Sequence, residues 1–392
     1  MSRVLLALHR IGPYHHVRLQ TAATLLEIHA LESRPRSQEY PWSFEPQGSY
    51  VIHQLSGQLQ PEADPPLATL DQQLAALLNR LHPQVVVSVG WADRAYQRLL
   101  LAAQRRHIPV VIVSDSRERD EPRSNGKEAI KRQLLRGYSA ALVAGRESRA
   151  YLEQLGFPQT AIFQPWDVVD TAFFAQTPRH AAQSPTTAAG PAGSHFLCVS
   201  RFVPKKHHAG LLAAYGRYQR QGGSWGLRLI GAGPLQADLE EAIARVPDPS
   251  RVQLHPFQQL SELAASYAQA SAFVLASSSD QWGLVVNEAM AAGLPCLVSS
   301  ACGCAADLIE HGRTGWCFDP ASPEQLTSLM HGCERQSSTD RDAMVLAARR
   351  RLEAFSPEAF ASGLRQAVEW ALAHPRRSRR ATLTAQLLSH RP

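Results

Sequence analysis

Short apolar runs alternate with longer amphipathic stretches along the second half of the chain, and this alternation constrains the fold more than any other feature. The short runs are apolar at nearly every position, which is typical of strands that are buried on both faces. Parallel strands joined by helical crossovers give this pattern, so we expect an α/β domain with a parallel sheet between two layers of helices. The expected strands are 196–200, 227–231, 252–257, 272–276 and 296–299, and the expected helices are 207–220, 234–246, 261–270, 284–292 and 305–310.

The first half of the chain has the same alternation in a less regular form. Residues 33–60 are rich in Pro, Gln and Ser and give no clear element. The remaining pattern predicts a second doubly wound domain. Its expected strands are 4–8, 85–89, 110–113 and 140–143, and its expected helices are 17–27, 70–80, 95–106 and 127–136.

Residues 177–194 contain only small and polar side chains, with no large apolar residue. Such a segment has nothing to bury, so we expect a solvated linker. It separates a domain at 1–176 from a domain at 195–355, each of ordinary domain size. Ligands of two doubly wound domains are expected in a cleft between them, at the carboxyl ends of the strands.

Composition and charge exclude several classes of protein. The net charge is +6, but five of the arginines follow His374 in a segment without acids, so the folded body is nearly neutral and we expect no nucleic-acid partner. No run of 18 apolar residues is present, and the N-terminus has the pattern of a first strand rather than of a signal peptide. The six cysteines all lie in the second half, which indicates reduced thiols and a cytoplasmic location.

The most informative segment runs from Asp280 to Pro295 and joins an expected strand to an expected helix. Gly283, Leu284 and Val285 would present backbone N–H groups at a helix N-terminus, which is a site for anionic oxygens. Asp280 and Glu288 are eight residues apart, and their carboxylates can accept hydrogen bonds from sugar and ribose hydroxyls. The alternative is that Asp280 only caps the helix and Glu288 is solvated.

Two further loops follow expected strands. Arg201 and Lys206 are five residues apart and could clamp a diphosphate, because Arg offers a planar pair of donors and Lys a compact charge. The alternative is a solvated basic loop. Gly231 and Gly233 allow a ligand to approach the backbone closely, or simply form a tight turn.

These motifs in this order resemble the retaining glycosyltransferases of family 4, which have the GT-B fold. The resemblance is densest from Phe196 to Pro320. It implies two Rossmann-like domains facing across a cleft and a nucleoside-diphosphate sugar as donor, with no cofactor and no metal. It also implies that Arg201 and Lys206 stabilise the leaving diphosphate and that Glu288 binds the ribose. Asp280 takes the position of the family's sugar-contacting Glu, with a side chain shorter by one methylene.

The first half resembles such enzymes more narrowly. Gly12 lies where the family places a glycine loop near the donor phosphates. His15 and His16 are candidates for the acceptor side, with a surface or core role as the alternative. Trp91 could stack on a sugar face or belong to the core. Asp170 lies just before the linker, where we expect a structural turn.

Cations recur at helical spacing at Lys127, Lys131, Arg132 and Arg136. They form either a solvated helix face or a surface for anionic lipid that brings the protein to a lipid-linked acceptor at the inner face of a membrane. We expect a C-terminal helix at 356–374 that packs back on the first domain, then a basic tail at 375–392. Cys302 and Cys304 are expected to pack as small apolar residues rather than to bind metal.

The predicted activity is transfer of a sugar from a nucleoside diphosphate to a hydroxyl of a glycan or lipid-linked acceptor, with retention at the anomeric carbon. The alternatives are another GT-B reaction, such as that of a nucleotide-sugar epimerase or a phosphorylase, or a catalytically inactive sugar-nucleotide-binding protein. A nicotinamide-dependent oxidoreductase does not fit, because Gln236 interrupts the required glycine pattern after Gly233.

Overall fold

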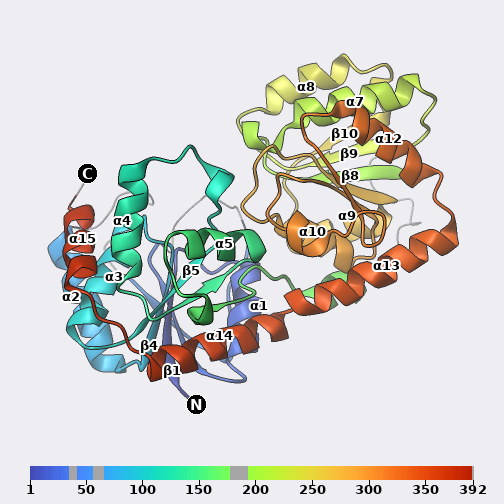
Figure 1. The fold of residues 1–392 in the computed structure, drawn as a ribbon. Coiled ribbons are helices and arrows are strands. Elements are labelled where there is room, and N and C mark those ends of the chain that lie inside the picture. Colours follow the sequence, from blue (N-terminus) through green and yellow to red (C-terminus); the bar gives the residue numbers. More distant parts are fainter. Residues whose placement is uncertain (35–41, 56–65, 177–192, 391–392) are drawn as a thin grey trace. The chain divides into compact units, whose positions relative to one another are not determined.

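A computed structural model describes residues 1–34, 42–55, 66–176 and 193–390 (Figure 1). The chain divides into two compact units. The N-terminal unit comprises residues 1–168 together with 357–392, and the C-terminal unit comprises residues 169–356. The expected linker at 177–194 lies outside the described residues except for Gly193 and Ser194.

The N-terminal unit is built on a parallel sheet with the strand order β3-β2-β1-β4-β5-β6-β7. Its strands are β1 (Arg3–Leu8), β2 (Glu27–Glu32), β3 (Val51–Gln54), β4 (Val85–Val89), β5 (Val110–Ser114), β6 (Ala140–Val143) and β7 (Ile162–Phe163). Its α-helices are α1 (Pro13–Ala22), α2 (Leu67–Leu81), α3 (Arg94–Arg105), α4 (Asn125–Leu135), α5 (Arg146–Gln154), α14 (Pro357–Ala373) and α15 (Arg379–Ser389).

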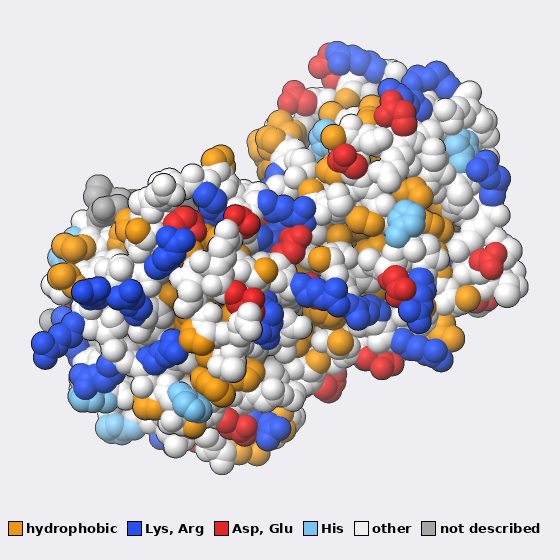
Figure 2. Space-filling view, viewed as in Figure 1, with side chains coloured by type: hydrophobic (Ala, Val, Ile, Leu, Met, Phe, Trp, Pro, Cys, Tyr) orange, Lys and Arg blue, Asp and Glu red, His pale blue; other side chains and the backbone are white. Residues whose placement is uncertain are grey.

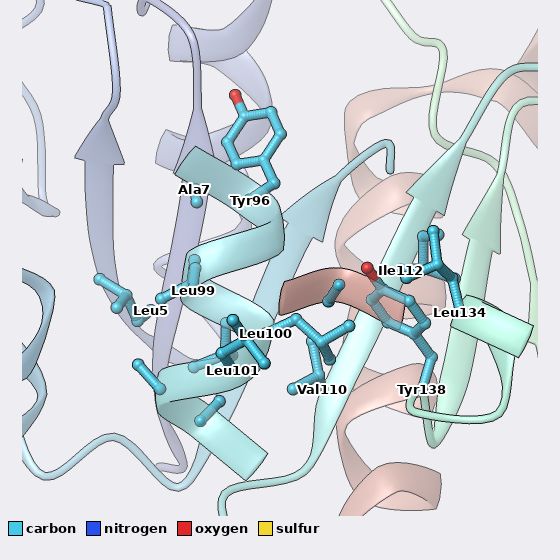
Figure 3. Packing of buried hydrophobic residues seen from close by; sticks show 14 of the residues in the cluster. Leu5, Ala7, Tyr96, Leu99, Leu100, Leu101, Val110, Ile112, Leu134 and Tyr138 are labelled. Carbon is cyan, nitrogen blue, oxygen red and sulfur yellow. The ribbon is translucent and has the colours of Figure 1, made fainter. Parts of the chain in front are cut away.

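The core of this unit shows why its strands are apolar at successive positions. Leu5 of β1 and Ile112 of β5 are fully buried against Leu99 and Leu100 of α3 (Figure 3). The next residue on β1, Leu6, is equally buried, although it points to the opposite face of the sheet. Helices therefore cover both faces of the sheet, as the sequence predicts.

The C-terminal unit repeats this architecture with the parallel order β10-β9-β8-β11-β12-β13. Its strands are β8 (His195–Val199), β9 (Gly226–Ile230), β10 (Val252–His255), β11 (Ala272–Leu275), β12 (Cys296–Ser299) and β13 (Trp316–Phe318). Its α-helices are α6 (Thr171–Gln176), α7 (His208–Arg220), α8 (Gln236–Ala244), α9 (Leu260–Gln269), α10 (Leu284–Ala291), α11 (Ala305–Leu308), α12 (Pro323–Glu334) and α13 (Ser338–Leu352). Each unit thus has the doubly wound, Rossmann-like order in which the central strand begins the series.

Two segments differ from the sequence-based expectation. The helix expected at 17–27 is α1, which begins at Pro13 and ends at Ala22, because proline is favoured in the first turn. Residues 27–32 then pair with β1 as β2.

The segment expected as a basic tail at 375–392 instead forms helix α15, which contacts α3 and α4 (Figure 1). Ser378 caps this helix by accepting a hydrogen bond from the backbone N–H of Ala381. Ala381 and Ala385 are fully buried, and their small side chains let the helix approach its neighbours closely. The preceding helix α14 packs on α1 and β6, within the N-terminal unit.

Candidate active site

The sheet of the C-terminal unit has its topological switch point between β8 and β11. Ligands of doubly wound sheets bind where the strand order reverses, beyond the carboxyl ends of the strands. The loops that leave β8 and β11 touch there, since the backbone N–H of Ser278 donates to the carbonyl of Lys205 over 2.8 Å. The motif residues Arg201, Lys206 and Asp280 all lie on these two loops.

Lys206 and Asp280 form an ion pair at this point, through Nζ and Oδ2. Their side chains are only 13% and 12% exposed. The backbone around Asp280 is fixed as well, because its carbonyl accepts from the N–H of Gly303 over 2.9 Å. Helix α10 has Gly283 as its N-cap residue and no side-chain hydrogen bond at this cap, so Asp280 does not cap this helix. Asp280 therefore pairs with Lys206 at the switch point instead of capping the helix.

A short turn sets the position of Lys206. Residues Pro204–Lys206 form a 3₁₀ turn, and His207 follows with a φ of 52°, which redirects the chain into α7. His208 then donates to or accepts from Ser200, with 2.9 Å between Nε2 and Oγ, which closes the base of the loop. Burial and the nearby Lys206 charge lower the pKa of His208 to about 4, so its ring is neutral at pH 7.

Glu288 is fully enclosed on α10. Its Oε2 accepts a hydrogen bond from the hydroxyl of Tyr267 on α9 over 2.7 Å, and that hydroxyl also lies 3.3 Å from the carbonyl of Val285. The alternative of a solvated Glu288 is therefore wrong. Sequence reasoning missed Tyr267, although a tyrosine among the small residues of 261–270 is a signal that could have indicated it.

The turn before α10 has the predicted form. Gly283 has a φ of 106°, a conformation that favours glycine, and helix α10 starts at Leu284. Trp282 is buried and donates from Nε1 to Oδ1 of Asn287 over 2.9 Å, which fixes the turn against the helix. The N-terminus of α10, with Leu284 and Val285, lies beside the ion-paired Asp280 in the same loop.

Gly231 and Gly233 are required by packing between two loops. A Cβ on Gly231 would lie 1.9 Å from the carbonyl oxygen of Ser200, and one on Gly233 would lie 2.5 Å from that of Phe202. The loop after β8 therefore fills the space that glycine opens. The structure places these glycines beside the Arg201 loop. Arg201 itself is exposed on that loop.

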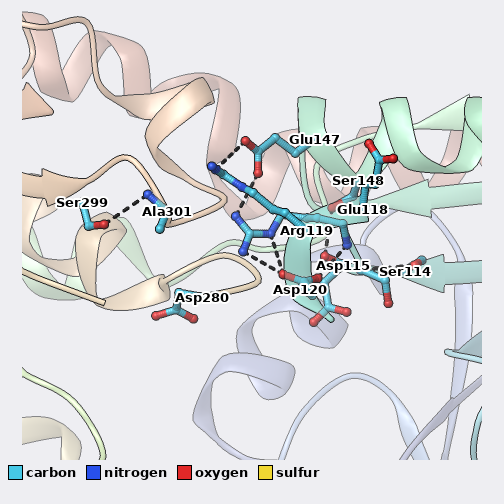
Figure 4. Close-up of polar contacts among 12 residues, drawn as sticks. Ser114, Asp115, Glu118, Arg119, Asp120, Glu147, Ser148, Asp280, Ser299 and Ala301 are labelled. Atoms are coloured by element: carbon cyan, nitrogen blue, oxygen red, sulfur yellow. Dashed lines mark hydrogen bonds and ion pairs between the residues drawn. The ribbon is translucent and has the colours of Figure 1, made fainter. Parts of the chain in front are cut away.

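Cys302 and Cys304 are fully buried beside this site, as small apolar residues. The backbone N–H of Cys304 donates to the carbonyl of Trp282 over 3.1 Å. Ser299 Oγ accepts from the N–H of Ala301 over 3.1 Å, and this bond shapes the loop after β12 (Figure 4). Across the described ranges, no group of three or more His, Cys, Asp or Glu side chains is placed to hold a metal ion.

The candidates in the N-terminal unit lie near its own switch point, between β1 and β4. Gly12 precedes α1, and a Cβ there would meet Trp42 at an ordinary 3.6 Å. His15 lies beside Trp166, with 6.4 Å between ring centroids, and desolvation together with the Arg18 charge lowers the pKa of His15 to about 3.

Each of the other candidates has a partner within its own unit. His16 Nδ1 lies 2.9 Å from the hydroxyl of Tyr50. Trp91 packs against the hydrophobic core, with Lys131 Nζ 5.5 Å from its ring centroid, which favours the core alternative. Asp170 lies in the C-terminal unit and accepts from the backbone N–H of Phe173 over 2.9 Å, the structural turn that the sequence predicts.

Charged side chains at the carboxyl end of β5 and the start of α5 form a network that the sequence reasoning did not resolve. Glu147 accepts from Arg119 over 2.6 Å and from Arg117 over 2.8 Å, and Asp120 also binds Arg117 (Figure 4). Ser148 donates to the carbonyl of Asp115 over 3.0 Å. These pairs hold the loop after β5 in one conformation.

Comparison with known proteins gives a family match within the C-terminal unit. Residues 190–351 match the family model described as Glycosyl transferases group 1. The sulfoquinovosyl transferase SQD2 of Arabidopsis thaliana is 34% identical over 146 residues, which are 36% of this chain and 27% of that protein. The amylovoran biosynthesis glycosyltransferase AmsK of Erwinia amylovora is 33% identical over 163 residues, 40% of each chain. The chain thus spans well under half the length of either relative.

Solved structures show the fold of the whole chain. Alr3699/HepE of Anabaena, solved in complex with UDP and glucose, has a TM-score of 0.71 at 15% identity and covers 94% of this chain and 100% of its own. A sucrose-phosphate synthase from Thermosynechococcus elongatus has a TM-score of 0.73 at 17% identity, over 95% of this chain and 100% of its own. The expected GT-B fold, with two Rossmann-like domains, is confirmed.

Proposed function

The chain carries a glycosyl transferases group 1 domain at residues 190–351, and we propose that it moves a sugar from a nucleoside-diphosphate donor to a hydroxyl acceptor with retention at the anomeric carbon. The observation that carries this proposal is the buried Lys206–Asp280 pair at the switch point between β8 and β11. The sequence motifs indicate both residues, which are 74 positions apart in the chain, and the fold brings them into contact.

The pair suits the chemistry of a departing diphosphate. Negative charge grows on that group in the transition state, so a fixed cation beside it stabilises the transition state more than the ground state. Asp280 orients the Lys206 ammonium in the loop, and Arg201 on the same loop supplies a second cation from solvent. The N–H groups at the start of α10 add partial positive charge at the same edge. These groups would stabilise the leaving diphosphate without a metal ion or another cofactor.

The donor class follows from the similar proteins. HepE was solved in complex with UDP and glucose, and its fold matches this chain along nearly the whole length. We propose that Glu288 on α10, whose carboxylate is held by the Tyr267 hydroxyl, takes a ribose hydroxyl once donor binding opens this buried pair. The acceptor is proposed to be a growing glycan or a lipid-linked saccharide, as amylovoran synthesis by AmsK suggests.

The test combines a donor screen with three charge variants. Thermal-shift titration against a panel of nucleotide sugars selects the donor, and mass spectrometry and the anomeric NMR coupling of the product establish transfer with retention. Lys206→Met should lower turnover by about 10², the usual effect of losing one such charged contact. Asp280→Asn, which removes the partner of that cation, should also lower turnover.

Lys205→Met is the matched control, because the Lys205 side chain is exposed and only its carbonyl joins the two loops. It should retain most of the activity. Near-normal turnover of Lys206→Met would refute the proposed role. An isomerised donor without a transferred sugar would show another GT-B reaction, and donor binding without any product would show a binding protein.

We also propose that a basic and apolar face on α4 and α15 brings the protein to anionic membrane at the cytoplasmic side. Leu383 and Leu387 are 59% and 63% exposed, one turn apart on α15 and opposite the buried Ala381 and Ala385. Figure 2 shows hydrophobic and basic side chains next to one another over this region. The exposed cations of these two helices and their ends are Lys127, Arg132, Arg136, Arg379 and Arg380, of which Arg132 and Arg136, four residues apart, share one side of α4.

Lys131 is not part of this face, because its Nζ donates to the Tyr151 hydroxyl over 2.7 Å and pairs with Glu128. None of the helices within the described ranges is long and apolar enough to cross a bilayer. Because this binding would combine basic and apolar contacts with the membrane surface, flotation with anionic vesicles should weaken as salt is raised and in the double variant Leu383→Gln/Leu387→Gln. Leu346→Gln is the control, because Leu346 on α13 is an exposed leucine (52%) outside this region. Failure to float at low salt would contradict the proposal.

A further inference from the structure

A cavity lies at the amino ends of the strands of the C-terminal sheet, where β8, β9 and β10 begin, opposite the edge that carries the Lys206–Asp280 pair. It has a volume of about 300 Å³. His195 is the first residue of β8, Gly226 the first of β9, and Arg251 directly precedes β10. The cavity is therefore separated from the Lys206–Asp280 site by the length of the strands. None of the side chains that line it is a carboxylate.

Arg228 on β9 is the main charge in this cavity. Its Nε donates to Oε1 of Gln253 over 3.0 Å and its Nη1 to Oε1 of Gln269 over 2.9 Å. Both acceptors are neutral amides, so the guanidinium charge is not balanced by a carboxylate in these contacts. Burial lowers the pKa of Arg228, as expected for a cation that has been desolvated without an ion-pair partner.

His195 faces the same cavity and is 8% exposed. Its Nδ1 lies 3.4 Å from the carbonyl of Gly193, while its Nε2 is buried without a hydrogen-bond partner among the described residues. Buried polar atoms in folded proteins are nearly always paired, so an unpaired nitrogen beside a cavity indicates a partner that enters from solvent. Burial and the Arg228 charge lower the pKa of His195 to about 4.

The surroundings favour an anion over other partners. His255, two residues after Gln253 on β10, lies near Arg228, and burial together with the Arg228 charge lowers its pKa. Arg251 donates to the carbonyls of Gly223 and Ser224, at 2.9 and 3.1 Å, and its charge is balanced by Asp248, with 3.3 Å between Nε and Oδ2. Arg228 is therefore the lining cation whose contacts described above include no carboxylate, and its guanidinium offers paired donors that match phosphate oxygens.

We propose that this cavity binds a phosphate group, either as free phosphate or carried on a small organic molecule. The Arg228 guanidinium would balance its charge, and Nε2 of His195, whose Nδ1–H faces the carbonyl of Gly193, would accept from a P–OH group or a hydroxyl of the ligand. Trp225, which lines the cavity and is 7% exposed, would cover any organic part. The site lies away from the proposed donor site and does not depend on the function proposed above.

The test is calorimetric titration of the full chain with inorganic phosphate and, in a second arm, with glycerol 3-phosphate. Tighter binding of the ester indicates an organic phosphate, and equal or tighter binding of the inorganic ion indicates free phosphate. Since the proposed donor site also attracts phosphate, the titrations are repeated in Lys206→Met. Binding should persist in Lys206→Met and weaken at least about tenfold in Arg228→Gln, which is the loss expected for one charge-assisted contact.

Arg245→Gln, on the surface of the same unit, is the matched control and should bind as the wild type does. Arg228→Lys keeps the charge and should bind more tightly than Arg228→Gln. If Arg228→Gln does not fold, the His195 ring-proton NMR signals of the wild type provide the readout, and phosphate should shift them. Unchanged affinity in Arg228→Gln, unshifted His195 signals, or binding that disappears in Lys206→Met would each overturn the proposal.

Discussion

The Tyr267→Phe variant tests whether Glu288 is held as a buried carboxylate. Both residues are fully buried, and the Tyr267 hydroxyl donates to Glu288 Oε2 over 2.7 Å. A hydrogen bond to a charged group contributes about 1.5–3 kcal/mol, and its loss leaves the carboxylate without that donor in a site closed to water. We expect the variant to lose about 2 kcal/mol of unfolding free energy, which for a domain of this size lowers Tm by about 4–8 °C.

The matched control is Tyr215→Phe in the same unit. Tyr215 is also fully buried, but its hydroxyl donates to a neutral acceptor, the carbonyl of Trp225, over 3.0 Å. Its loss should cost about 1 kcal/mol. Urea unfolding at pH 7 measures both. If Tyr267→Phe loses no more stability than Tyr215→Phe, the Tyr267 hydroxyl does not support a charged Glu288.

Two further predictions concern the loops around the ion pair. Gly231→Ala should lower the free energy of unfolding by about 3 kcal/mol or more in the same urea assay, because its Cβ would lie 1.9 Å from a backbone oxygen. The control is Gly332→Ala on α12, where a Cβ meets nothing within 4 Å, and it should be neutral or stabilising by up to about 1 kcal/mol. His208 has a folded pKa of about 4, below the 6.5 of the unfolded chain, so the stability it contributes is present above pH 6.5 and is lost as the pH falls, by about 1.4 kcal/mol per pH unit. The urea midpoint should therefore fall less steeply between pH 6.5 and 5 in His208→Gln than in the wild type, and identical slopes would contradict this.

Much of the fold could be predicted from local sequence. Runs such as 85–89 and 272–275 are strands because continuous apolar residues suit a sheet that is covered on both faces. The strand β2 was not predicted, because residues 27–32 carry charged and histidine side chains among the apolar ones. Helix α15 was missed for a related reason. Its arginines suggested a solvated tail, while its burial rests on two alanines that carry little hydrophobic signal.

The candidate site was predictable in its residues but not in its contacts. The spacing of Arg201, Lys206, Asp280 and Glu288 identified the loops. It did not show that Lys206 forms an ion pair with Asp280, nor that the Tyr267 hydroxyl donates a hydrogen bond to Glu288. The glycines at 231 and 233 were recognised, yet the atoms that require them belong to a different loop.

The sequence by itself determined which segments become strands and helices and which loops carry charge, because apolar periodicity and turn residues act over a few neighbouring positions. Only the tertiary structure decided which charges meet, since β8 and β11 are adjacent in the sheet although they are far apart in the chain. That adjacency brings Lys206 to Asp280, and the adjacency of β9 and β10 gives Arg228 an amide partner in Gln253. Pairing of this kind depends on strand order, which no local pattern specifies.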